Sequence, residues 1–225
     1  MALIKTRARQ TTVERVAEGT ETFVRGFRDG TLSMADLQTA MALEGRIFEA
    51  KAGTFTAPIT FKAGAIVATT PTYEMRIPAG TTIIPLELNV QIESIGTALI
   101  LEILATGGQG GSTTTAGTAI VPANLRSDAP VKSVCLCSHT TLTVVAPTKN
   151  YQEIWRTGEI SAVNQTHSDT VSVYDHAHTY NWKAADAGAY TALVGASNLF
   201  FYISTQAGTG FFSIKWMELP SGAIV

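Results

Sequence analysis

The sequence contains few charged residues. Asp, Glu, Lys and Arg make up 15% of its 225 residues, whereas they make up about 25% of an average globular domain. The formal net charge is −2, so the chain has no basic field that would attract nucleic acid. We therefore expect no nucleic-acid partner.

Long apolar runs are also absent. No run in the sequence reaches the roughly 18 apolar residues that a membrane-spanning helix needs. The opening segment MALIKTRARQ is basic but lacks the apolar core of a signal peptide. We expect no membrane partner and a protein that is made and used without secretion.

Cysteine is scarce, and its two positions are Cys135 and Cys137. On a strand these side chains would share one face about 7 Å apart, too far for an unstrained disulfide. We therefore predict two reduced thiols packed in a sheet. His139 extends the same face, but the three side chains would spread over about 13 Å, too wide for one zinc ion.

Motifs that carry enzyme chemistry are missing as well. The glycine-rich tract at 107–118 has no Gly-Lys-Ser/Thr ending and no helix after it, so we interpret it as a mobile surface loop rather than a phosphate loop. No Gly-x-Ser-x-Gly segment is present. The glutamates of the predicted strands fall mostly on solvated faces, namely Glu74, Glu87, Glu93 and Glu102. The sequence predicts no enzyme and no cofactor.

The sharpest candidate for a chemical site is the pair His176 and His178. On a strand their imidazoles would share a face, as two ligands of one metal ion require. The H-x-H spacing resembles that of the cupins, which are metal-dependent jelly-roll enzymes. The glutamate that this pattern places a few residues later is missing after Thr179. We therefore predict no metal site and interpret the pair as a loop edge or a contact between subunits, with metal binding as the weaker alternative.

The sequence does contain a clear alternation of apolar and polar residues. Through residues 86–93 two sets of side chains face opposite ways, Leu86, Leu88, Val90 and Ile92 on one side and Glu87, Asn89, Gln91 and Glu93 on the other. This pattern predicts a strand with one buried and one solvated face. An almost continuous apolar run at 98–104 follows, and together the two runs predict a long antiparallel hairpin. Pro85 predicts a bulge or an edge position.

Further strand-like segments continue to the end of the chain, at 151–163, 170–182, 190–205 and 211–219. The runs at 199–204 and 211–216 flank a short loop with two glycines, which predicts a second hairpin. Eight to ten strands at regular spacing predict a mainly β fold. We expect an antiparallel, jelly-roll-like β-sandwich over residues 54–225.

The first 53 residues have a different pattern. Thr11 begins a Thr-x-x-Glu capping box, and apolar residues recur at helical intervals until Gly30. A second helical pattern starts at Ser33 and runs through Phe48 to Gly53. We predict an N-terminal helical arm over residues 1–53. Two such helices cannot form a core alone, so the arm packs on its own β domain or on another copy of the chain.

Two segments carry a resemblance to a known class of protein: IPAGTTIIPLEL at 77–88 and the closing strands at 197–220. With the low charge and the arm, they resemble the jelly-roll capsid and decoration proteins of tailed bacteriophages, over residues 54 to the end. The resemblance implies a non-enzymatic virion protein, made in the host cytoplasm. It also implies a homotrimer that binds neighbouring capsid or other virion proteins as a decoration, cement or minor capsid component.

A second class of function is open. Several aromatic residues could form a surface on which sugar rings stack, namely Tyr151, Trp155, Tyr174, Tyr180 and Trp182. The alternative is therefore a carbohydrate- or receptor-binding module of a phage tail or head fibre. It requires two or three of these rings to be exposed and coplanar.

Overall fold

The computed structural model describes residues 37–54, 56–94, 100–140, 142–160, 178–205 and 208–221. These residues form sixteen strands and one short helix, α1 (Leu37–Leu43). The prediction of a mainly β protein with antiparallel sheets is confirmed. No helix in the described ranges has the length and apolar character needed to cross a membrane.

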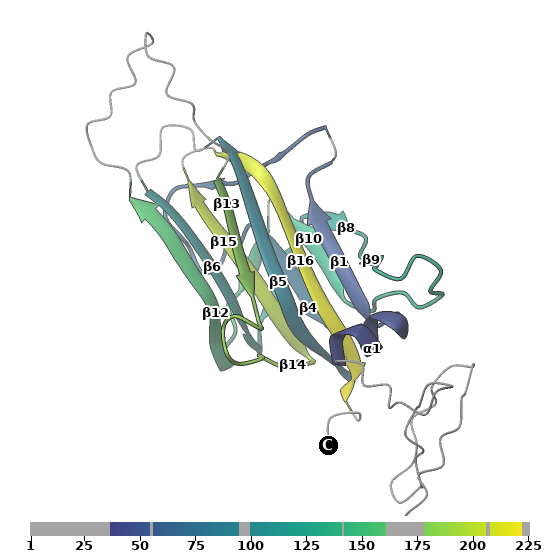
Figure 1. Ribbon diagram of the computed structural model, residues 1–225. Helices are drawn as coiled ribbons and strands as arrows, with labels where there is room; N and C mark the ends of the chain where they lie inside the picture. The colour runs from purple at the N-terminus through teal and green to yellow at the C-terminus, as the bar shows by residue number, and fades with distance from the viewer. Residues whose placement is uncertain are drawn as a thin grey trace, which may run out of the picture.

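One large sheet, here called sheet 1, has seven strands in the order β13-β5-β16-β1-β9, with β14 beside β5 and β2 beside β16. Its strands are β1 (Ile47–Ala52), β2 (Ile59–Thr60), β5 (Thr81–Ser94), β9 (Ala123–Asn124), β13 (His178–Lys183), β14 (Leu193–Val194) and β16 (Thr209–Pro220). Figure 1 shows β5, β16 and β1 side by side along the length of the body.

The second large sheet, sheet 2, also has seven strands, in the order β12-β6-β15-β4-β10-β8 with β3 beside β15. Its strands are β3 (Lys62–Ala63), β4 (Tyr73–Ile77), β6 (Ile100–Gln109), β8 (Thr118–Ile120), β10 (Leu136–His139), β12 (Lys149–Ile160) and β15 (Ser197–Thr205). Strands β7 (Ser112–Thr115) and β11 (Thr143–Val145) form a separate two-stranded sheet.

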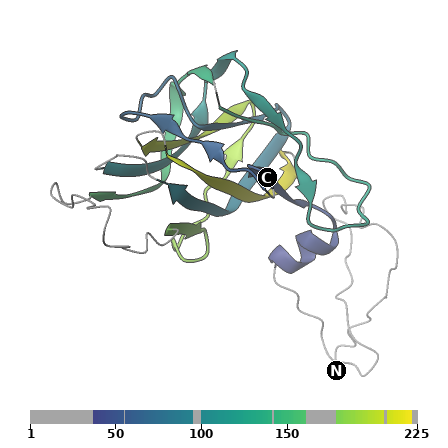
Figure 2. The same cartoon turned by 90° about the horizontal axis from the view of Figure 1, so that it is seen from above.

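The two large sheets pack on each other through one hydrophobic core, which gives the body a β-sandwich-like form (Figures 1 and 2). Phe212 of sheet 1 stacks on Phe201 of sheet 2 with ring centroids 4.3 Å apart, and it lies 4.8 Å from the ring of Tyr73. Buried aromatic rings remove large apolar areas from water, so these contacts stabilise the packing of sheet on sheet.

The alternation predicted for residues 86–93 is confirmed in β5 from Leu88 onward, whereas Leu86, which lies at the register shift, is only partly buried. Leu88, Val90 and Ile92 are buried in the core, while the residues between them face away from it. The register of β5 on β16 shifts where Lys215 lies opposite Glu87 and the next residue, Trp216, lies opposite Pro85. This shift is the predicted bulge, and it accommodates a proline in an interior strand.

The pairing of both predicted hairpins is wrong. Strand β5 pairs with β16, β13 and β14, whereas β6 pairs with β12 and β15. Strands β15 and β16 likewise belong to different sheets. Alternation shows that one face of a strand is buried, but two consecutive strands can bury their apolar faces either side by side in one sheet or across the core from each other. It therefore does not decide which strands are neighbours.

The second predicted helix is confirmed only for Leu37–Leu43. It ends in a Schellman motif, in which the amide of Arg46 donates to the carbonyl of Met41 (2.8 Å) and that of Gly45 to Ala42 (3.0 Å). Gly45 has a φ of 68°, which glycine adopts readily. The helical prediction is therefore wrong for residues 47–52, which form β1 and pair with β16. The first predicted helix lies outside the described residues.

The glycine-rich tract is strand rather than the predicted mobile loop. Residues 107–109 end β6, β7 lies within the tract, and β8 begins at its last residue, Thr118. A Cβ atom on Gly107 would lie 2.6 Å from Cδ2 of Leu193, and one on Gly117 would lie 2.2 Å from the carbonyl oxygen of Thr140. Glycine at these positions lets a neighbouring segment of the chain approach the backbone closely, which is a common role of glycine inside a sheet.

Candidate functional site

The predicted histidine pair is only partly within the described structure. His176 lies outside the described residues, and His178 begins β13 at one edge of sheet 1. The absence of a metal site at this pair therefore stays a prediction, with metal binding as its weaker alternative. Among the described residues, no group of three or more His, Cys, Asp or Glu side chains is placed to hold a metal ion.

The two cysteines are free and buried, as predicted. Burial raises the pKa of the Cys135 thiol, and burial raises the pKa of Cys137 to about 12. The thiolate is the reactive form, so both side chains are poor nucleophiles at neutral pH. Burial lowers the pKa of His139, whose Nδ1 lies 2.5 Å from Oγ1 of Thr140. The two cysteines are therefore core side chains, and His139 is partly buried.

The glutamates of the predicted strands have different surroundings. Glu93 is exposed, and Glu102 forms an ion pair with Arg156. Glu87 accepts hydrogen bonds from the ammonium of Lys215 (2.8 Å) and the amide of Asn181 (3.1 Å). These three are near solvent, as predicted, and they do not converge on a common site.

Glu74 is the exception, because it is fully buried. Its Oε1 accepts hydrogen bonds from Oγ1 of Thr113 (2.5 Å) and from the amide of Asn198 (3.1 Å). Thr113 belongs to β7, so the β7–β11 sheet covers the outer face of sheet 2 at this point. The prediction of a solvated Glu74 is wrong, since it took no account of this cover.

The aromatic residues predicted as a sugar-stacking surface do not form one within the described part of the chain. Trp155, Tyr180 and Trp182 are partly buried against the core, and the Trp155 ring lies 6.1 Å from that of Phe201. Tyr151 is 54% exposed, and Tyr174 lies outside the described residues. The exposed, coplanar set on which the carbohydrate-binding alternative depends is thus absent from the described members.

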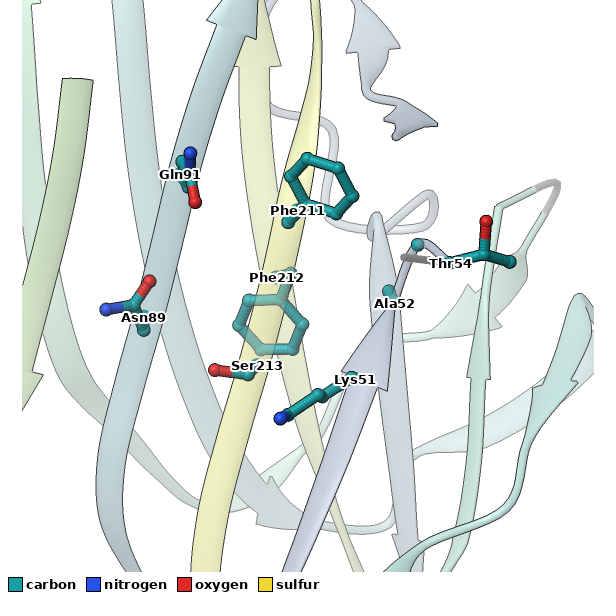
Figure 3. A pocket seen from close by; sticks show the side chains of 9 residues that line it. Lys51, Ala52, Thr54, Asn89, Gln91, Phe211, Phe212 and Ser213 are labelled. Carbon is teal, nitrogen blue, oxygen red and sulfur yellow. The ribbon is translucent and has the colours of Figure 1, made fainter. Parts of the chain in front are cut away.

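A hollow of about 440 Å³ opens instead on the outer face of sheet 1, the face that points away from the core (Figure 3). Lys51 on β1 lies opposite Ser213 on β16, which lies opposite Asn89 on β5. The adjacent row contains Phe211 and, opposite it, Gln91. The lining residues are Lys51, Ala52, Gly53, Thr54, Asn89, Gln91, Phe211, Phe212 and Ser213.

The polar side chains of this hollow are available to a ligand. Within the part of the chain that the structure describes, no side-chain hydrogen bond engages Asn89, Gln91 or Ser213. The ammonium of Lys51 lies 3.1 Å from Oε2 of Glu49 on the same strand. Sequence reasoning did not find this group. The sequence feature that could have indicated the hollow is Phe211, an aromatic residue at an outward position of a strand whose next outward residues are polar.

A second candidate surface lies around β8, β9 and β10, at the end of each large sheet that is opposite to β13 and β12. It is here called the β8–β10 edge. Four apolar side chains are exposed there, namely Val121 (90%), Leu125 (45%), Val134 (53%) and Leu136 (57%). Helix α1 lies beside it, where Nη1 of Arg126 donates to the carbonyl oxygen of Leu43 (2.6 Å). Both views show α1 at the periphery of the body on this side (Figures 1 and 2).

Comparison of the chain with protein-family models, with curated proteins and with solved structures gives no match. Function therefore has to follow from the two surfaces of the chain itself: the β8–β10 edge, which is apolar, and the hollow on sheet 1, which combines one aromatic ring with neutral polar groups.

Proposed function

We propose that this chain is a non-enzymatic structural protein with a jelly-roll fold, which self-associates as a homotrimer. In this proposal it is made in a host cytoplasm and binds neighbouring capsid or other virion proteins as a decoration, cement or minor capsid component. The single observation that supports self-association best is the set of exposed apolar side chains at the β8–β10 edge.

The strand order supports the jelly-roll part of the proposal. In chain order the eight principal strands are β1, β4, β5, β6, β12, β13, β15 and β16. The first, eighth, third and sixth are neighbours in sheet 1, and the second, seventh, fourth and fifth are neighbours in sheet 2. Two Greek keys wrapped around one core produce such an order.

The geometry of the β8–β10 edge supports an apolar contact. Cys137 lies opposite Ile120 in the pairing of β10 with β8, so the preceding Leu136 and the following Val121 are adjacent. Cys135 and Cys137 point into the core, whereas Val134 and Leu136, which alternate with them, are exposed. Isolated exposed apolar residues are common, but several on one edge are typical of an interaction site.

A second copy of the chain is the occupant that we propose for this edge. Helix α1 lies beside it, and the preceding residues 1–36 carry the predicted amphipathic pattern of Thr11 to Gly30. That pattern offers apolar side chains that need a partner surface. The arm of one subunit on the edge of the next would make a head-to-tail contact, which closes into a ring when its rotation fits three copies.

Light scattering of the purified full-length chain tests the proposal. We expect a mass of three times the 23.9 kDa chain mass, and the variant V121D/L136D should reduce it to that of a monomer. The matched control is V194D, because Val194 is 45% exposed on β14 beside β5, away from the β8–β10 edge. A monomeric wild type, or an unchanged mass for the double variant, would contradict the proposal.

The same sample tests the metal alternative at His176 and His178. Because we propose no bound metal, a chelator should change neither the mass nor the melting temperature. A bound metal stabilises the folded state, so its removal would lower the melting temperature. A clear fall on chelation would count against a purely structural role without a metal.

A further inference from the structure

The outer face of sheet 1 contains an aromatic residue, Phe211, at a position where solvated polar residues are expected. Along β16, Phe212, Ile214 and Trp216 are buried, and Phe211 belongs to the outward series with Ser213 and Lys215. An aromatic ring on an uncovered sheet face leaves apolar area in contact with water, which is unfavourable unless something covers it.

The ring of Phe211 lies against Gly53 on one side. A Cβ atom on Gly53 would lie 2.6 Å from Cδ1 of Phe211, so the ring occupies the space that a side chain at position 53 would fill. Gly53 has a φ of 100°, a conformation that residues with a Cβ rarely adopt. The other side of the ring lines the hollow (Figure 3). The result is a positioned apolar platform that is open to a ligand.

Neutral polar groups surround this platform. Asn89, Gln91 and Ser213 project from β5 and β16 around the ring, and the structure gives their side chains no hydrogen-bond partner among the described residues. An amide and a hydroxyl each offer both a donor and an acceptor. A ligand rich in hydroxyl groups, which also donate and accept, matches this set.

The charge of the hollow favours a neutral ligand. Lys51 is the one ionisable residue among those that line it, and Glu49 lies 3.1 Å from its ammonium. In the row beyond, the ammonium of Lys215 is paired with Glu87 at 2.8 Å. These charges are compensated by neighbours on the sheet, so the hollow presents no net field that would select an anion.

The backbone around the hollow argues against an extended peptide. A peptide that adds to a sheet needs an edge strand with unpaired amide and carbonyl groups. At Ser213, β16 is paired with β1 on one side and with β5 on the other. At this central strand, recognition therefore uses side chains. A volume of about 440 Å³ lies within the range of roughly 300–1,000 Å³ that small-molecule sites occupy.

From these observations we infer that the hollow on the outer face of sheet 1 binds a neutral saccharide. The sugar ring stacks on Phe211, and its hydroxyls exchange hydrogen bonds with Asn89, Gln91 and Ser213. The inference is independent of the proposed self-association, because the hollow and the β8–β10 edge lie on different surfaces.

Saturation-transfer NMR with the full-length protein tests the inference, followed by calorimetric titration of the best responder. The probes are neutral hexoses, pentoses and N-acetylhexosamines with their short oligomers, and inorganic sulfate is the anionic comparison. We expect saccharide binding that F211A weakens about tenfold or more, because it removes the stacked ring. N89A and Q91A should each weaken it by a few-fold. F211Y should retain binding, since the ring remains.

The matched control is T179A. Thr179 is exposed on β13 opposite Gln91, on the same sheet face but outside the hollow, so its loss should leave affinity unchanged. The inference is overturned if no saccharide in the panel gives a signal, if F211A binds as well as the wild type, or if sulfate binds more tightly than every sugar. An unchanged light-scattering mass and melting temperature for F211A would show that any lost binding reflects neither unfolding nor failed assembly.

Discussion

The outer faces of the two large sheets differ in whether other segments of the chain cover them. On sheet 2, Phe200 and Tyr202 of β15 pack with Leu104 and with Val144 of β11 in a second apolar cluster beneath the β7–β11 sheet. On sheet 1 no segment among the described residues covers the corresponding face, which carries the hollow beside Phe211. A strand's outward side chains are therefore solvated only where no other segment of the chain packs across them.

Glu74 and Glu87 show this contrast within one residue type. Both occupy outward positions of predicted strands. Glu87, on the open face, pairs with an ammonium, and the hydrogen bond from Lys215 is the largest cause of its lowered pKa. Glu74, on the covered face, accepts hydrogen bonds from the neutral donors Thr113 and Asn198. The cover thus changes the surroundings of a carboxyl group.

The largest effect should come from placing a charge beneath the cover. V144D puts a carboxylate into the second cluster, where Val144 is 2% exposed, and should lower the free energy of unfolding by about 3 kcal/mol or more. The matched variant V145D alters the next residue of β11, which is 44% exposed, and should change stability by less than about 0.5 kcal/mol. Urea unfolding measures both. Equal effects would mean that the β7–β11 sheet does not bury the face of sheet 2.

An intermediate effect should follow from removing the two carboxylates in turn. E74A leaves the buried donor Asn198 and the partly buried donor Thr113 without their acceptor, so we expect a loss of about 2 kcal/mol. E87A breaks an ion pair that is partly exposed to water, which should cost less than about 1 kcal/mol. Urea unfolding of both variants under one buffer condition gives the comparison. A larger loss for E87A than for E74A would reverse the assignment of covered and open faces.

The smallest effect concerns pH. The pKa of Glu87 is lower in the folded state than in the unfolded state, so its pairing contributes stability above the unfolded pKa of about 4.3. That contribution is lost as pH falls through the lower, folded pKa. E87Q should therefore flatten the decline in stability of the wild type below about pH 4.5, by well under 1 kcal/mol because solvent screens the pair. Melting temperatures of the wild type and E87Q from pH 7 to pH 3 measure this contribution. Parallel curves for the two proteins would contradict the lowered pKa of Glu87.

The amino-acid sequence alone was enough to predict the features that depend on near neighbours along the chain. It predicted a mainly β protein, the alternate burial of Leu88, Val90 and Ile92, the bulge at Pro85 and the buried thiols. Each follows from a local pattern, because alternation reports that a strand has two faces, and a proline cannot donate a ladder hydrogen bond wherever it stands.

The three-dimensional fold sets which strands are neighbours and which faces are covered. It placed β5 and β6 in different sheets, made Ile47–Ala52 a strand on β16, and brought β7 over Glu74. It also assembled the hollow from three strands, β1, β5 and β16, whose residues are far apart in the sequence. An apolar side chain can be buried by a neighbouring strand, by a strand across the core or by a returning segment, and a local sequence pattern does not distinguish these partners.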